Sequence, residues 1–279
     1  MNGDWKYYWL KKEKKFVKAV NHVLDLGHAK GPNFKAYLAR STQEEIRKKM
    51  EEKGDEGSRT HKAITDLING SKVTMSTKYP TDLGDGRQTI LLHDEWENLI
   101  GFQNWCSRYQ PRVVAHEYTV QGEDAAGTLD ALLVITIPAG DKDFDKAFWG
   151  KDVLILIDWK SSAAIWFEYE AQTAAYWQMV KANKDFAKFI KAYEGRIFTG
   201  VVRLGTRHKT KYEFVWWDQK KTEGEHWGRF LSAVFIANRY EPDVDFVPEI
   251  EQFPIQLFTK VPKATVAAKK KATIKKEVV

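Results

Sequence analysis

Residues 152–160 read Asp-Val-Leu-Ile-Leu-Ile-Asp-Trp-Lys, and the rest of the fold can be worked out from this segment. The five residues between the two aspartates are β-branched or leucyl, which is typical of a strand buried on both faces of a sheet. Side chains alternate along a strand, so Asp158 and Lys160 are expected on one face and Trp159 on the other. Charged groups at the end of a buried strand are costly without partners. Either they pair with each other, or Asp158 holds a metal ion and Lys160 holds the phosphate or water beside it.

Further candidate ligands precede this strand. The segment Gly-Thr-Leu-Asp-Ala-Leu-Leu-Val-Ile at 127–135 predicts a second apolar strand with Asp130 near its start. Glu117 lies in a short β-prone run before it, and His61 lies near the start of an amphipathic helix. Three carboxylates and one imidazole would form a hard, oxygen-rich site. Such a ligand set suits Mg²⁺ or Mn²⁺ better than a closed zinc site.

A helix is predicted downstream, from about residue 165 to 183. Gln172 and Tyr176 are four positions apart and therefore share one face of it. Each candidate has an ordinary interpretation on its own: a structural histidine for His61, a plain strand residue for Glu117, and helix surface for Gln172 and Tyr176. It is the order of the motifs along the chain that favours a functional site.

In this order the motifs resemble those of the PD-(D/E)XK nuclease superfamily, specifically its RecB-like branch. The resemblance runs from about Tyr7 to about Tyr240. It implies an α/β (α+β) fold of the restriction-endonuclease type, with a mixed central β-sheet flanked by helices. No proline precedes Asp130, in contrast to the superfamily name, but the Gly-x-x-Asp form is normal for this branch.

The resemblance also implies roles for individual residues. Catalytic roles fall to Asp130, Asp158, Lys160 and Glu117; metal coordination falls to His61, Asp130, Asp158, Glu117 and the backbone carbonyl of Trp159; nucleic-acid contacts fall to Gln172, Tyr176 and Ser161. The expected activity is that of a DNA exonuclease that hydrolyses phosphodiester bonds with one or two Mg²⁺ or Mn²⁺ ions, on single strands or DNA ends. The alternatives are a structure-specific endonuclease of the same fold and a non-catalytic nucleic-acid-binding relative. A helicase or recombination protein is a conceivable partner by analogy alone.

Composition narrows these options. The chain has 279 residues, 43% of them hydrophobic, which is enough for a sizeable core. Its single cysteine, Cys106, excludes an intramolecular disulfide and a four-cysteine iron–sulfur cluster, which several members of this branch carry. No apolar run is long enough to span a bilayer, and no signal peptide is recognisable near Met1. We therefore expect no membrane association and a cytoplasmic location, the host cytoplasm if the protein is viral.

Three segments are expected along the chain. Residues 1–56 would form a hairpin and helices, with a helix from Thr42 to Lys53 broken at residues 54–57. Residues 57–240 would form the nuclease core, ending in a helix near 223–239 whose inward residues are Trp227, Phe230, Leu231, Val234 and Phe235. Residues 241–279 would be an extension with a flexible lysine-rich tail. This tail carries the whole net charge of +6, so it either solubilises the chain or binds polyanions.

Overall fold

The computed structural model describes residues 6–10, 12–28, 31–81 and 86–241. These residues all belong to one unit, which extends from Met1 to Asp243. The expected lysine-rich extension lies outside the described residues. Within the described part, no helix has both the length and the apolar character that crossing a bilayer requires.

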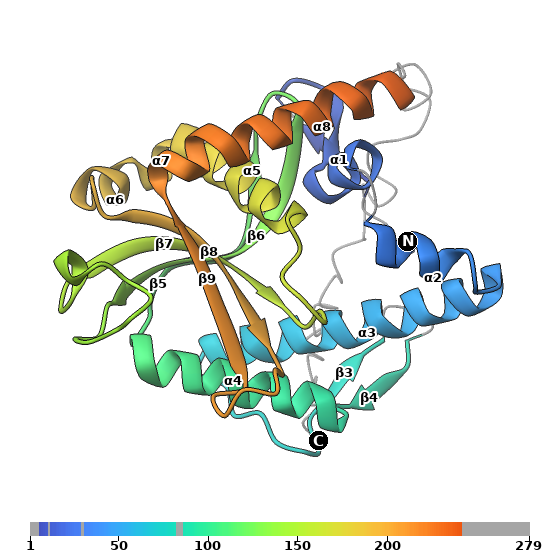
Figure 1. Cartoon of the computed structure of the whole chain (residues 1–279), viewed down its shortest axis with the longest axis horizontal. Helices are drawn as coiled ribbons and strands as arrows, with labels where there is room; N and C mark the ends of the chain where they lie inside the picture. Colours follow the sequence, from blue (N-terminus) through green and yellow to red (C-terminus); the bar gives the residue numbers. More distant parts are fainter. Residues whose placement is uncertain (1–5, 11, 29–30, 82–85, 242–279) are drawn as a thin grey trace, which may run out of the picture. The chain divides into compact units, whose positions relative to one another are not determined.

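The centre of the fold is a seven-stranded mixed sheet (Figure 1). Its strands are β1 (Tyr7–Leu10), β2 (Lys15–Ala19), β5 (Arg112–Gln121), β6 (Ala125–Thr136), β7 (Asp152–Lys160), β8 (Ile197–Leu204) and β9 (Tyr212–Asp218). Their order is β1-β2-β6-β7-β8-β9, and β5 also pairs with β6. The β2–β6 and β7–β8 pairs are parallel, whereas the other pairs are antiparallel. A small separate sheet pairs β3 (Lys78–Pro80) with β4 (Gln88–Ile90).

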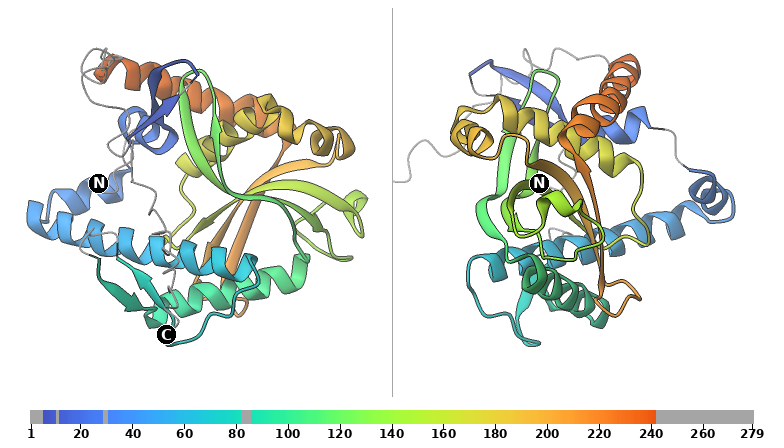
Figure 2. Two further views of the ribbon diagram at one scale, coloured as in Figure 1. Left: turned by 180° about the vertical axis from the view of Figure 1, so that it is seen from behind. Right: turned by 60° about the vertical axis from the view of Figure 1, so that its left-hand side comes forward.

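Helices pack on both faces of the sheet (Figures 1 and 2). One face is covered by α1 (Val20–Gly27), α5 (Glu168–Ala182) and α8 (Trp227–Tyr240), and the other by α3 (Gln43–Ile68) and α4 (His93–Tyr109). Shorter helical segments are α2 (Pro32–Leu38), α6 (Ala187–Ala192), α7 (Gln219–Lys221), two 3₁₀ turns (Lys146–Phe148 and Lys184–Phe186) and a π-helical turn (Thr222–His226). This arrangement confirms the predicted mixed α/β architecture.

Strand β7 is buried on both faces, as its apolar run predicts. Leu154 and Leu156 pack into the core under α1, α5 and α8. Val153 and Ile155 pack into the core under α3 and α4. A strand that must face two apolar layers has no solvent side, which explains why its sequence is uniformly apolar instead of alternating.

The predicted break between Lys53 and His61 is wrong, because α3 is one continuous helix of 26 residues. It begins with a capping box in which Thr42 and Glu45 satisfy each other's backbone N–H groups. Pairs such as Arg47–Glu51 then support its exposed face. A helical glycine costs only about 1 kcal/mol relative to alanine, so Gly54 and Gly57 do not end the helix. The expected domain boundary between residues 56 and 57 consequently falls inside α3.

The predicted inner face of α8 is partly wrong. Phe230 and Val234 are buried and Trp227 packs against the same core, as expected. Leu231 and Phe235 instead face outwards, and the Phe235 side chain is 76% exposed. Each follows a buried position by one residue, a rotation of about 100° around the helix. The buried stripe is completed by the small residues Ala233 and Ala237.

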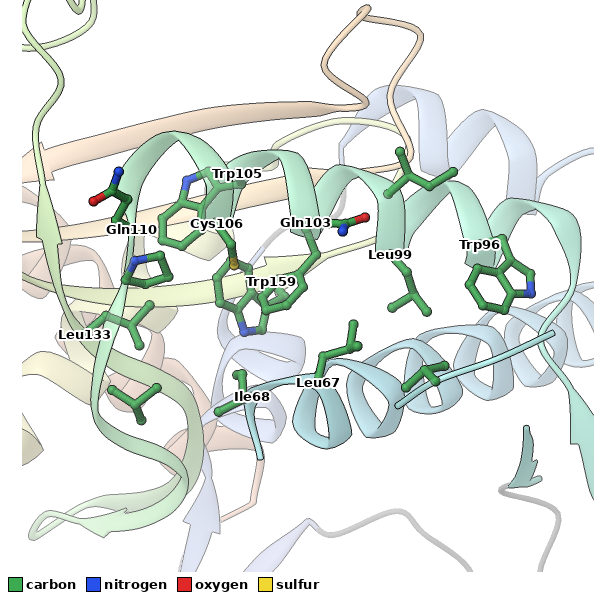
Figure 3. Close-up of a pocket in the computed structure, with 15 residues that line it drawn as sticks. Leu67, Ile68, Trp96, Leu99, Gln103, Trp105, Cys106, Gln110, Leu133 and Trp159 are labelled. Atoms are coloured by element: carbon green, nitrogen blue, oxygen red, sulfur yellow. The ribbon is translucent and has the colours of Figure 1, made fainter. Parts of the chain in front are cut away.

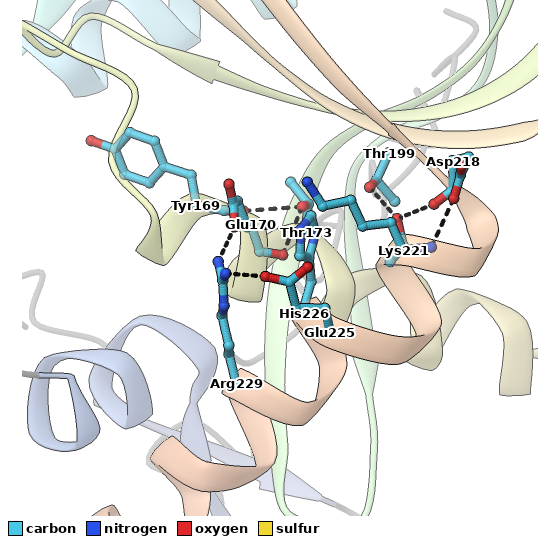
Figure 4. Close-up of polar contacts among 10 residues, drawn as sticks. Tyr169, Glu170, Thr173, Thr199, Asp218, Lys221, Glu225, His226 and Arg229 are labelled. Carbon is cyan, nitrogen blue, oxygen red and sulfur yellow. Dashed lines mark hydrogen bonds and ion pairs between the residues drawn. The ribbon is translucent and has the colours of Figure 1, made fainter.

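Polar contacts hold α5 against the start of α8 (Figure 4). Glu170 of α5 forms an ion pair with Arg229 of α8. Nearby, the hydroxyls of Thr199 on β8 and Thr222 in the π-helical turn are hydrogen-bonded at 2.8 Å. His226 ends this turn and is fully buried. The turn therefore links the sheet, α5 and α8 at one point.

Candidate metal centre and adjoining cleft

The candidate site lies where β6 and β7 separate. Their ladder ends at the Ala131–Ile157 pair, although continuation of the same register would bring Asp130 opposite Asp158. Beyond this pair, β7 continues along β8, whereas the first residues of β6 pair with β2. Backbone groups near the end of β7 must therefore find partners other than β6.

The backbone of Trp159 finds those partners in two candidate ligands. Its N–H donates a hydrogen bond to Asp130 Oδ2 at 2.7 Å, and its carbonyl oxygen lies 3.1 Å from His61 Nε2. The indole ring points the other way and packs edge-on against Phe102 and Trp105, with ring centroids 5.2 Å apart in each case. Strand alternation thus separates the polar backbone contacts of Trp159 from its apolar side chain.

His61, Glu117 and Asp130 form a cluster of possible metal ligands. One donor atom from each lies within 4.8 Å of the other two. His61 Nδ1 is 3.5 Å from Asp130 Oδ1. Two carboxylates and an imidazole at this spacing fit a divalent cation that accepts oxygen and nitrogen ligands. The structure therefore brings together three of the four side chains expected to hold metal.

Glu117 enters this cluster through an unusual backbone conformation. Its neighbours His116 and Tyr118 pair with Ala131 and Leu129, so Glu117 sits opposite Asp130. Its φ is +46°, in the left-handed region that costs a non-glycine residue roughly 1 kcal/mol or more. The Thr65 hydroxyl, one turn after His61 on α3, donates a 3.4 Å hydrogen bond to its carboxylate. Strain of this kind is concentrated at functional positions.

The charges in the cluster perturb one another. Burial, followed by the nearby Asp130 carboxylate, raises the pKa of Glu117 above its usual range. Burial alone would lower the pKa of His61, but Asp130 outweighs this effect and raises that pKa to about 9. The raised pKa of His61, and the smaller contribution of Asp130 to that of Glu117, reflect the negative charge in the cluster. A bound cation would relieve the repulsion between the two carboxylates.

Asp158 and Lys160 pair with each other beside this cluster. Their Oδ2 and Nζ atoms are 2.7 Å apart, and the Asp158 side chain is only 2% exposed. Burial raises the pKa of Asp158 to about 6, against the opposing effect of Lys160. Lys160 Nζ also lies 4.8 Å from the centre of the Tyr169 ring. The structure thus contains the ion pair, and Asp158 does not belong to the three-residue cluster. Metal coordination by Asp158 stays a prediction.

Contacts of the two residues just before His61 hold α3 against α4. Arg59 and Glu95 of α4 form a buried ion pair at 2.7 Å. Asn98, also on α4, donates a 3.3 Å hydrogen bond to Thr60. These contacts involve the two residues before His61, which is itself 31% exposed. His61 is thus partly accessible, with its two ring nitrogens beside oxygen atoms of Trp159 and Asp130. Its role as a metal ligand stays a prediction.

Gln172 and Tyr176 lie inside the protein, so their interpretation as helix surface is wrong. The Tyr176 side chain is 4% exposed and shares a side-chain hydrogen bond with Gln172. Its ring packs on Gly127 so closely that a Cβ there would lie 2.6 Å from Tyr176 Cε1. The glycine of the Gly-x-x-Asp motif thus makes room for this ring next to Asp130. Contact of Gln172 and Tyr176 with nucleic acid stays a prediction.

A cleft of about 1360 Å³ adjoins the site. Residues lining it include His61, Trp159, Lys160 and Ser161 from the site, the basic residues Lys49, Lys53, Arg203 and Arg207, and the aromatic residues Tyr37, Trp166 and Tyr169. Ser161, expected to contact nucleic acid, therefore faces this cleft. Acidic residues Glu56, Asp94 and Glu97 also line it.

The sequence alone does not predict most of these cleft residues. Tyr37, Lys49 and Trp166 lie far apart in the chain and in no motif, so nothing in the sequence joins them. A weak signal exists for Arg207, which belongs to a basic turn between β8 and β9. Thr65 could have been found, since it follows His61 by one helical turn and shares its face.

No protein-family model matches the chain, and a search of curated proteins finds no match either.

Proposed function

We propose that the protein is a metal-dependent nuclease that hydrolyses phosphodiester bonds, acting as a DNA exonuclease on single strands or ends. One observation carries this proposal: the backbone of Trp159 joins the His61–Glu117–Asp130 cluster to the buried Asp158–Lys160 pair, beside a cleft lined with basic and aromatic side chains. Acids, an imidazole and a lysine next to such a cleft support chemistry on a polyanionic substrate.

In this proposal His61, Glu117 and Asp130 hold Mg²⁺ or Mn²⁺. The ion, when bound, supplies a Lewis acid and lowers the pKa of bound water. Asp158 keeps Lys160 charged and directed, since their ion pair raises the pKa of the lysine despite its burial. The Lys160 ammonium then stabilises negative charge that develops on the phosphoryl group. Trp159 orients the ligands through its backbone.

The cleft would hold the polynucleotide. Lys49 and Arg207 line the cleft and would contact phosphates, which dominate the affinity of nucleic-acid binding. Trp166 is 43% exposed at the cleft and offers a ring on which a base could stack. Base stacking on an aromatic ring tolerates every sequence, as an enzyme without sequence specificity requires.

Digestion of labelled DNA tests the proposal. Linear single-stranded, linear duplex and circular single-stranded DNA are incubated with Mg²⁺, Mn²⁺ or EDTA. Loss of linear strands with a divalent ion, with circles spared, is the expected result, and the position of the end label gives the polarity. Cutting of circles would favour the endonuclease alternative. Binding without cutting would favour the non-catalytic alternative.

Two pairs of variants assign the activity to this site. Asp158→Asn and Lys160→Met should abolish cutting. Asp152→Asn, at the other end of β7, and Lys151→Met, just before it, should retain it. Full activity in the first pair would show that the nuclease activity resides elsewhere.

A further inference from the structure

A second cavity lies on the other side of Trp159, between α3 and α4 (Figure 3). Its volume is about 630 Å³. Side chains from α3, α4, β5, β6 and β7 line it, and most of them are apolar or aromatic. None of these described lining residues carries a charge. In Figure 3, Leu67 and Ile68 of α3 point towards Leu99 and Cys106 of α4, and the ring of Trp159 lies between Ile68 and Cys106.

This cavity borders every element that supplies the candidate metal centre. Ile68 lies two turns after His61 on α3, Val113 precedes Glu117 on β5, and Leu133 follows Asp130 on β6. Trp159 itself belongs to β7. The cavity thus lies next to the elements that form the metal centre, although the cavity itself has no part in the proposed hydrolysis.

We propose that this cavity is a binding site for a small, neutral, predominantly apolar molecule whose occupancy alters cation binding at the metal centre. Binding itself does not depend on the proposed nuclease function. The coupling and the proposed nuclease function share one requirement, which is a cation bound at His61, Glu117 and Asp130.

The size and lining of the cavity define the class of ligand. Its volume falls within the roughly 300–1000 Å³ of small-molecule sites, which are mostly apolar with a few polar groups. The amides of Gln103 and Gln110 can donate to one or two acceptor atoms on the ligand. Burial raises the pKa of the Cys106 thiol to about 12, so this side chain is also uncharged at neutral pH. A charged ligand would lose its hydration here without gaining an ionic partner.

The coupling follows from the position of the Trp159 ring. A molecule packed against this ring restricts the residue whose N–H and carbonyl contact Asp130 and His61. It also fixes the spacing between α3 and α4, on which the position of His61 depends. A ligand changes the affinity of a second site only through such differential contacts.

Titration with N-phenyl-1-naphthylamine, a neutral probe that fluoresces in apolar surroundings, tests the binding. We expect saturable binding of one probe per chain. Cys106→Phe should fill the cavity and weaken binding at least about tenfold. Ser107→Phe, on the exposed neighbouring position of α4, should leave it unchanged. Several equivalent probes per chain, or equal binding by both variants, would overturn the proposal.

The single cysteine gives a second measurement on the unaltered protein. Alkylation of Cys106 by N-ethylmaleimide should slow several-fold when the probe is present. An unchanged rate at saturating probe would place the probe elsewhere and overturn the proposal. This arm holds even if Cys106→Phe does not fold.

Calorimetry with Mn²⁺ tests the coupling. The Kd for Mn²⁺ should change at least about threefold between free and probe-saturated protein, with the same factor acting on probe binding when Mn²⁺ is saturating. Equal Mn²⁺ affinity in both states would overturn the coupling while leaving the binding site. Absence of Mn²⁺ binding in either state would overturn the proposed metal centre, and this outcome is independent of the probe titration.

Discussion

The cleft and the cavity on either side of Trp159 differ in volume and in the chemistry of their lining. The cleft beside Lys160 is large and lined by acidic, basic and aromatic side chains, whereas the cavity between α3 and α4 is smaller and has no charged lining among its described residues. Trp159 is the one described residue that lines both. Its backbone N–H and carbonyl contact Asp130 and His61 on the charged side, next to the cleft. Its ring lies on the apolar side, against the cavity.

The contrast between the two shows how one strand can carry ionised groups on one face and an apolar ring on the other. Burial of the Asp158 carboxyl, on the opposite face of β7 from the Trp159 ring, raises its pKa. The same burial strengthens its attraction to Lys160. The Asp158–Lys160 pair thus owes part of its electrostatic character to its burial. Substitutions on either side of Trp159 test whether the two sides depend on each other.

Asp130→Asn should abolish the function of the metal centre while leaving the apolar cavity intact. We expect a loss of DNA hydrolysis of about a thousandfold or more, because a metal ligand is lost, together with loss of Mn²⁺ binding in calorimetry. Asp124→Asn, in the exposed turn before β6, is the control and should behave like the unaltered protein. Substantial hydrolysis by Asp130→Asn would refute the assignment of the metal centre.

Trp159→Ala should alter both the cleft and the cavity, because the Trp159 side chain lies between them. Truncation of a buried tryptophan costs about 3–5 kcal/mol of unfolding free energy, measured by chemical denaturation. Trp166→Ala, which is partly exposed, should cost about 0.5 kcal/mol or less but weaken DNA binding. If Trp159→Ala kept both its stability and its Mn²⁺ affinity, the two sides would not depend on this residue.

Two histidines should respond to pH with opposite signs. Burial, followed by Lys221 and Arg229, lowers the pKa of His226 to about 4, so between about pH 4 and 6.5 it is neutral in the folded protein and protonated in the unfolded chain. Stability from His226 is therefore full above pH 6.5 and falls by about 2 kcal/mol by pH 5. His61 has a raised pKa of about 9, so its contribution is full below pH 6.5 and is lost as the pH rises through 9.

Denaturation of His226→Phe and His61→Phe as a function of pH separates the two contributions. His226→Phe should flatten the acid side of the profile, and His61→Phe the alkaline side. Because His226 lies on the opposite face from α3, an acid limb that disappears only with His61→Phe would show that acid sensitivity belongs to the charged side instead.

Lys49→Ala should have the smallest effect, and it should change only DNA binding in the cleft. We expect the slope of log K against log salt to fall by about one unit for DNA binding, as for one lost phosphate contact. Lys188→Ala, on the exposed surface of α6, is the matched control. Equal slopes for the two variants would remove Lys49 from the nucleic-acid path.

The sequence predicts the parts of the site that lie within single strands. The apolar run before Asp158 places β7, and alternation correctly puts Asp158 and Lys160 on one face. The sequence does not show that β6 and β7 separate at Asp130, because this depends on β2 pairing with the start of β6 from far away in the chain. That separation is what leads Asp130 to the backbone of Trp159.

Helix length and burial were harder to predict for a different reason. Gly54 and Gly57 suggest an end to α3, but the cap at Thr42 and the contacts to α4 outweigh their intrinsic cost. Tyr176 reads as a surface residue because it is polar, yet Gly127 provides the space that buries it. Such compensation comes from tertiary partners, which no local pattern contains.

The hydrogen bond between the Trp159 amide and Asp130 also makes the site visible to spectroscopy. Ladder amides report on neighbouring backbone, whereas this amide donates to a carboxylate at 2.7 Å. Its proton and nitrogen chemical shifts should therefore follow the charge on Asp130. In a ¹⁵N-labelled sample, one backbone resonance would record the arrival of a cation or a proton without any added label, and its exchange with deuterium would show how often the two strands' ends come apart.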